Sequence, residues 1–70
     1  MDKQKFFEGI NRVCIEDYYS IRKAIITRCN VSRVTFRYWY NAKYVPCKKY
    51  QIIIDQIMEE YKYKPIYKED

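Results

Sequence analysis

The sequence predicts an all-α domain of four short helices followed by an extended C-terminal tail. Apolar residues recur at helical spacing in four separate segments, and residues typical of turns separate these segments. Residues 34–40, whose composition favours a strand, lack the alternation of apolar and polar residues that a half-buried strand requires. Seventy residues provide one small hydrophobic core. We therefore expect a single domain over residues 1–62, with residues 63–70 as the tail.

The first helix is predicted from Asp2, its N-cap, to about Cys14. Its apolar stripe is formed by Phe6, Phe7, Ile10, Val13 and Cys14. A second helix is predicted over roughly Asp17–Cys29, because Glu16 and Asp17 suit the positive end of the helix dipole. Its apolar stripe is formed by Tyr18, Ile21, Ile25 and Cys29, which leaves Arg22, Lys23 and Arg28 outside the stripe.

Asn30 is expected to end the second helix in the left-handed conformation, and Val31 to be buried in the turn. Ser32 is a strong N-cap for a third helix over about Arg33–Tyr40.

The composition of residues 34–40, VTFRYWY, favours a strand, whereas their spacing favours a helix. Alternation would leave neither face polar. Helical spacing instead groups Val31, Thr35, Phe36 and Trp39 on one side. The other side then carries Arg33, Val34, Arg37, Tyr38 and Asn41. We therefore predict a helix, with Phe36 and Trp39 in the core.

A loop that ends at Pro46 follows, and a fourth helix is predicted from Cys47 or Lys48 to Tyr61 or Lys62. Its apolar stripe is formed by Tyr50, Ile53, Ile54, Ile57, Met58 and Tyr61. Its exposed side is expected to carry Lys48, Lys49, Gln51, Asp55, Gln56, Glu59 and Glu60. The tail, YKYKPIYKED, contains Pro65 and is expected to be an extended arm, either packed or mobile.

The distribution of charge points to an anionic partner. Residues 18–54 contain no Asp or Glu, although the whole chain carries a net charge of +5. The basic residues of this span are Arg22, Lys23, Arg28, Arg33, Arg37, Lys43, Lys48 and Lys49. A basic centre between more acidic ends is typical of a surface that meets phosphate, although a solvated basic face would have the same composition.

Other classes of function find little support in the sequence. Histidine is absent, and Cys14, Cys29 and Cys47 are widely spaced, so we expect no metal, no cofactor and free thiols that are buried or half-buried. No residues partner Asp55, Glu59 and Glu60 in a way that suggests an enzyme. The sequence shows neither a signal peptide nor a membrane span, so we expect a cytoplasmic protein with no membrane partner.

The stretch from Ile25 to Met58 resembles the lambda-repressor-like (Cro/repressor) helix-turn-helix family. The resemblance lies in Val31-Ser32-Arg33-Val34-Thr35-Phe36, Trp39, Lys43 and Pro46, which match the family pattern without a gap. Asn30 and Ala42 stand where the family usually has glycine, and Ile26 stands where it usually has alanine.

The resemblance implies sequence-specific binding of double-stranded DNA by a small repressor-like regulator of transcription, with the third helix in the major groove. Base contacts are expected from Ser32, Arg33, Val34, Arg37, Tyr38 and Asn41. Phosphate contacts are expected from Arg22, Lys23, Lys43, Tyr44, Lys48 and Lys49. A homodimer is expected, joined through the first helix or the aromatic tail. Two alternatives remain open: a protein-interaction module on the same scaffold, and RNA binding through the same basic face.

Overall fold

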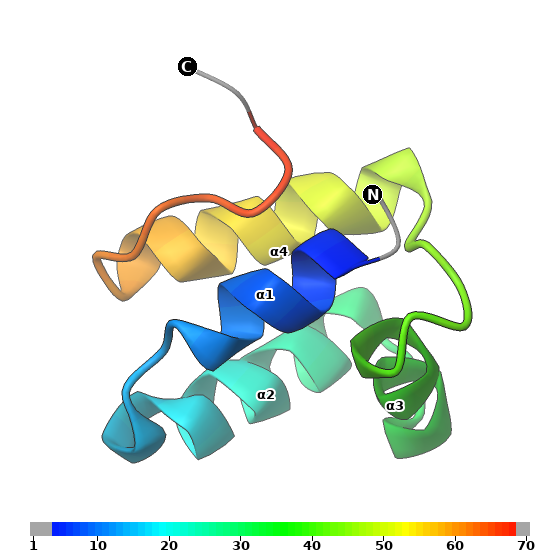
Figure 1. The fold of residues 1–70 in the computed structure, drawn as a ribbon, viewed down its shortest axis with the longest axis horizontal. Helices are drawn as coiled ribbons and strands as arrows, with labels where there is room; N and C mark the ends of the chain where they lie inside the picture. The colour runs from blue at the N-terminus through cyan, green and yellow to red at the C-terminus, as the bar shows by residue number, and fades with distance from the viewer. Residues whose placement is uncertain (1–3, 69–70) are drawn as a thin grey trace.

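The computed structural model describes residues 4–68, and within this range it contains four α-helices and no strand. The helices are α1 (Lys5–Asn11), α2 (Ile15–Cys29), α3 (Arg33–Tyr40) and α4 (Lys48–Glu60). The predicted all-α class with four short helices is confirmed. In the view of Figure 1, α1 overlaps the packed pair α2 and α4, and α3 lies at one end of the molecule.

The core lies where α2 packs against α4 and α1 packs against α3. Phe6 joins α1 to α3, because its ring meets Phe36 and Trp39 of α3 edge-on, with centroids 5.3 and 6.0 Å apart. Phe36 and Trp39 are only 3% and 4% exposed. The prediction that these two aromatics are core residues is therefore confirmed.

The turn between α2 and α3 forms at the predicted residues, although Val31, which was expected to be buried, is half-buried against the core. Asn30 adopts the left-handed conformation, with φ 56° and ψ 49°, and the Val31 N–H donates back to the carbonyl oxygen of Ile26 at 3.1 Å. Ser32 Oγ accepts a hydrogen bond from the Thr35 N–H at 3.1 Å. With both ends fixed and two aromatics buried, residues 34–40 form a helix despite their strand-like composition.

The first helix is shorter than predicted. It ends at Asn11 instead of Cys14, and the N–H of Arg12 and of Val13 then turn back to the carbonyls of Gly9 and Ile10. Cys14 becomes the N-cap of α2, which begins two residues before the predicted start at Asp17. Phe7 and Cys14 were expected in the apolar stripe, but both are exposed. The predicted cap, Asp2, lies outside the described residues.

The thiols are free as predicted, but only Cys29 is buried. Cys14 and Cys47 are exposed, and each is the N-cap residue of a helix. Burial raises the pKa of the Cys29 thiol above its ordinary value.

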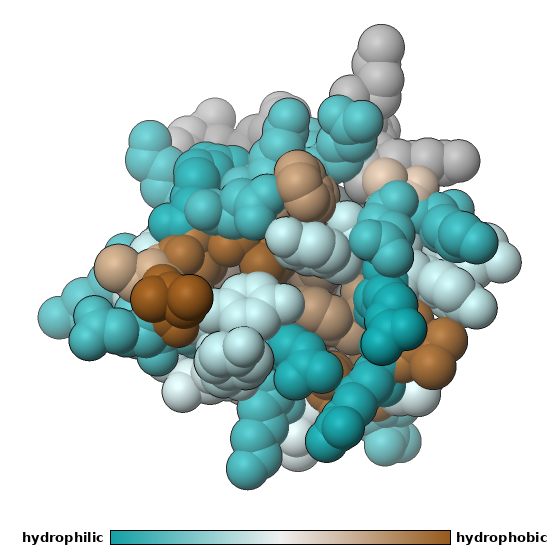
Figure 2. Space-filling model, turned by 60° about the horizontal axis from the view of Figure 1, so that its bottom comes forward, coloured by the Kyte–Doolittle hydropathy of each residue, from teal (hydrophilic) through white to brown (hydrophobic). Residues whose placement is uncertain are grey.

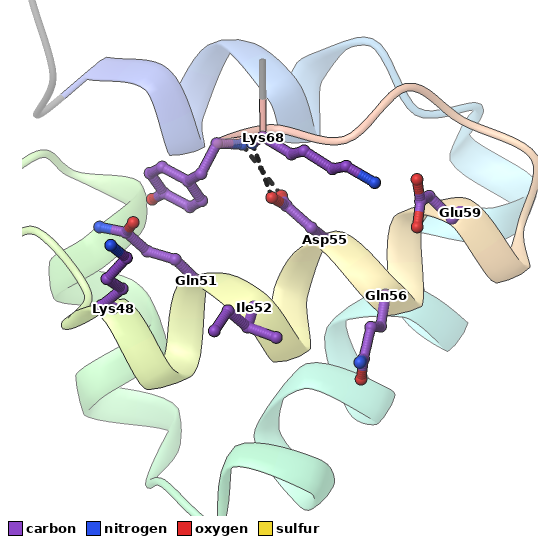
Figure 3. A pocket seen from close by; sticks show the side chains of 8 residues that line it. Lys48, Gln51, Ile52, Asp55, Gln56, Glu59 and Lys68 are labelled. Atoms are coloured by element: carbon purple, nitrogen blue, oxygen red, sulfur yellow. Dashed lines mark hydrogen bonds between the residues drawn. The ribbon is translucent and has the colours of Figure 1, made fainter. Parts of the chain in front are cut away.

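The tail is extended and packed. Ile66 is buried in the core cluster, and the backbone N–H groups of Ile66, Tyr67 and Lys68 donate to the carboxylate of Asp55 at 2.8, 2.9 and 2.7 Å. Figure 3 shows the Asp55 side chain on α4 reaching toward the tail. The prediction that Asp55 lies on the exposed side of α4 is wrong: it is 7% exposed, because the tail covers it.

Candidate nucleic-acid interface

The outer face of α3 carries the side chains that its spacing predicts. Arg33, Val34, Arg37 and Tyr38 are exposed, and Phe36 and Trp39 hold the opposite face of the helix in the core. Figure 2 views the molecule from the α2 and α3 side, where hydrophilic side chains alternate with pale and hydrophobic ones.

One side of α3 forms a hollow with α2. The hollow has a volume of about 250 Å³ and is lined by Tyr18, Arg22, Arg33, Phe36, Arg37 and Tyr40. The Arg22 guanidinium carbon lies 5.8 Å from the centroid of the Phe36 ring, which supports this cation against the core. The hollow therefore combines a cation from α2 with two cations from α3.

These three arginines have no carboxylate partner in the part of the chain that the structure describes. Arg28, on the same helix as Arg22, behaves differently: its Nη1 donates to both carboxylate oxygens of Glu60 at 2.9 Å. The ion pair links α2 to α4, and the charge of Arg28 is balanced by that of Glu60. Arg22, Arg33 and Arg37 thus keep their positive charge available to an external anion.

The other side of α3 meets the loop that follows it. The Tyr38 and Tyr44 rings lie edge to face with centroids 5.4 Å apart, and Lys43 Nζ lies 5.5 Å from the centroid of Tyr38. The loop can approach in this way because Ala42 adopts a positive φ of 63°.

The remaining predicted contact residues fall elsewhere around this face. The Ser32 hydroxyl caps α3, and Asn41 is the exposed C-cap, on the side of the helix that faces Phe7 of α1. Lys23 is exposed on α2. The structure therefore does not bring these residues into the arginine hollow.

Lys48 and Lys49 lie in the first turn of α4. Lys49 Nζ is 5.2 Å from the centroid of the Tyr50 ring. Lys48 lines a different hollow, of about 340 Å³, together with Asp55, Glu59 and the tail (Figure 3). Of the predicted phosphate contacts, Arg22 joins the arginine hollow and Lys43 and Tyr44 join Tyr38, whereas Lys48 and Lys49 stand apart.

Tyr18 and Tyr40 line the arginine hollow, although the sequence did not predict them there. Tyr40 also links α3 to α1, since its hydroxyl donates to Asn11 Oδ1 at 3.0 Å. The signal was present in the spacing: Tyr18 is one helical turn before Arg22, and Tyr40 is one turn after Arg37. The same spacing, however, is equally compatible with burial of these two aromatic rings in the core.

Within residues 4–68 there is no group of three or more His, Cys, Asp or Glu residues that could hold a metal ion. None of the helices described is long and apolar enough to cross a membrane. The chain matches no known family model, no curated protein and no solved structure.

Proposed function

We propose that this protein binds double-stranded DNA in a sequence-specific manner, as a small repressor-like regulator, through a helix-turn-helix formed by α2 and α3. The observation that carries the proposal is the hollow lined by Arg22, Arg33 and Arg37, none of which has a carboxylate partner among residues 4–68. Converging unpaired guanidinium groups favour a polyanion with many acceptors, and DNA offers both phosphate and guanine O6/N7.

The dimensions of an α-helix such as α3 suit this role. A helix with its side chains is about 10–12 Å across, and the B-DNA major groove is about 12 Å wide, so α3 can lie in the groove. In the proposed mechanism, the basic surface is first attracted to the phosphates and α3 then reads base edges. Arg33 and Arg37, one turn apart, would donate to guanines, while Arg22 would hold the adjacent backbone.

We further propose that the protein acts as a homodimer on a palindrome, with half-sites about 34 Å apart. Tyr61, Tyr63 and Tyr67 of the aromatic tail pack against the core of their own chain. Phe7 of α1 and Ile15 and Tyr19 of α2 are exposed. This difference favours the α1 side over the tail as the contact between two copies.

The test is selection of bound sequences from a random duplex pool, followed by titration at several salt concentrations. Affinity should fall with a log–log slope of about −0.9 per phosphate contact. Arg37→Ala should relax the preference at one base pair, at a cost of about 1–3 kcal/mol. Lys43→Ala, which removes a predicted phosphate contact beside Tyr38, should weaken all sequences alike and reduce the slope by about one contact.

Lys64→Ala is the matched control, since it removes the same charge from an exposed residue of the tail. It should leave both the preference and the slope close to those of the parent. A salt response that is flat, or an absence of duplex binding at low salt, would overturn the proposal. RNA binding that is equal to or tighter than duplex binding would support the RNA-binding alternative. Capture of an acidic protein through Tyr44 would support the protein-interaction alternative.

A further inference from the structure

The two exposed sides of α3 differ in chemistry. Arg33 and Arg37 point into the hollow shared with α2. Val34 and Tyr38, each one position further along the chain, lie toward the loop, where Tyr38 meets Tyr44. Residues four apart share a face of a helix, so each pair forms a short ridge along α3. The recognition surface therefore has a cationic ridge and an apolar ridge.

The apolar ridge is exposed but ordered. Val34 is 51% exposed, Tyr38 is 36% exposed and Tyr44 is 60% exposed. The edge-to-face contact fixes the Tyr44 ring against Tyr38, which makes the loop a continuation of the helix surface. These three side chains form one apolar surface, which we call the Val34–Tyr44 ridge.

Cations flank this ridge on both sides. Arg33 and Arg37 lie toward α2, and Lys43 lies over the Tyr38 ring on the loop side. Residues 18–54 contribute no acidic side chain to either flank. An apolar strip with cations on both sides complements a surface that has apolar groups between two rows of anions. The DNA major groove is such a surface, since thymine C5-methyl groups lie on its floor between two phosphate chains.

The spacing of the side chains along α3 also matches the spacing of base pairs along DNA. Residues four apart along α3 rise by about 6 Å, which is close to two base-pair steps of about 3.4 Å each. Val34 and Tyr38 would thus reach bases about two steps apart on one side while the arginines reach bases on the other.

We propose that the Val34–Tyr44 ridge reads thymine methyl groups, so that the protein selects thymines beside the guanines bound by its arginines. Tyr44 thereby becomes a specificity residue, where the sequence predicted a phosphate contact. This inference rests on the proposed function and specifies the class of DNA sequence that the same surface selects.

The test replaces thymine by deoxyuridine, one position at a time, in the duplex recovered by selection. The replacement removes only the methyl group and keeps the base pair. Each thymine under the ridge should lose about four-fold in affinity, the value of one buried methylene-sized group. Thymines outside the contacted half-site should show no change.

Two variants assign the effect to the ridge. Val34→Ala and Tyr44→Ala remove exposed side chains and leave the core intact. Each should bind the parent duplex more weakly and should lose its sensitivity to deoxyuridine at one position. Arg37→Ala is the matched control, because it should weaken binding at guanine and keep the sensitivity at thymine.

The outcomes separate the two proposals. An absence of duplex binding would overturn both of them. Duplex binding that is indifferent to every thymine methyl would overturn only the reading by the Val34–Tyr44 ridge. Deoxyuridine sensitivity that survives unchanged in both Val34→Ala and Tyr44→Ala would assign the methyl contacts to other residues, and would overturn it as well.

Discussion

Two buried polar groups lie where the tail packs on α4, and only one of them has hydrogen-bond partners. The Asp55 carboxylate accepts three backbone hydrogen bonds, which offset the cost of its burial. The Tyr67 hydroxyl is also buried, and it has no hydrogen-bond partner among the described residues. An unsatisfied buried hydroxyl destabilises the folded state, so Tyr67 is a place where the sequence does not serve stability.

Tyr67→Phe should therefore raise the free energy of unfolding by roughly 1 kcal/mol, since it removes the unsatisfied hydroxyl and keeps the ring. Urea denaturation of the variant and the parent measures the difference. A loss of stability would show that the hydroxyl makes a favourable interaction.

The stability of the parent and that of Tyr67→Phe should also depend differently on pH. Burial, and then the charge of Asp55, raise the pKa of Tyr67 above its ordinary value of 10.0. The folded state therefore holds this proton more tightly than the unfolded chain. Below pH 10 both states keep the proton, and the difference in stability between parent and variant is constant. As the pH rises above 10, the unfolded chain loses the proton first, and the parent loses stability relative to the variant. The parent should lose more stability than Tyr67→Phe between about pH 9 and 11; parallel curves would contradict this account.

At the scale of one element, α3 is defined by its two ends. Ser32 caps its start. At its other end the Lys43 N–H donates to the carbonyl oxygen of Tyr38 at 2.9 Å, and this closure requires Ala42 to adopt φ 63°. A left-handed conformation is unfavourable for alanine because of its Cβ, whereas glycine adopts it freely.

Ala42→Gly should stabilise the protein by about 0.5–1 kcal/mol, because the relief of backbone strain exceeds the greater freedom of glycine in the unfolded chain. Thermal or urea denaturation measures the change. Ala24→Gly, inside α2, is the matched control and should destabilise by about 1 kcal/mol. Destabilisation by both substitutions would mean that the Ala42 conformation carries no strain.

At the scale of the whole molecule, the tail completes the core. Ile66 packs against Gly9 of α1, at a point where an added Cβ would lie 2.5 Å from Ile66 Cγ1. Residues 63–68 thus form one packed unit with the helices, although composition alone had separated them at residue 62. The single glycine of the chain lies where the tail crosses α1.

Gly9→Ala should destabilise the protein by about 1–3 kcal/mol, because the new methyl group overlaps Ile66. In a helix without this contact, the same substitution would stabilise by up to about 1 kcal/mol. Denaturation of Gly9→Ala in the parent and in an Ile66→Ala background separates the two effects. The loss should shrink or reverse in the second background, and an equal loss in both would show that the tail does not press on Gly9.

Much of the candidate site could be predicted because helical spacing decides which residues share a face. Arg33, Val34, Arg37 and Tyr38 follow from the register of α3, once Phe36 and Trp39 are assigned to the core. The convergence of Arg22 with Arg33 and Arg37 could not be predicted, since it depends on how α2 and α3 pack.

The sequence by itself determined the local structure: the turn at Asn30, the cap at Ser32 and the helical state of residues 34–40 each depend on groups within a few residues of one another. Only the tertiary structure decided which polar residues are buried and which cations stay unpaired. Asp55 is eleven to thirteen residues from its backbone donors, and Arg28 is 32 residues from Glu60. Short-range periodicity cannot distinguish such residues from exposed ones, because their partners are set by how distant segments pack.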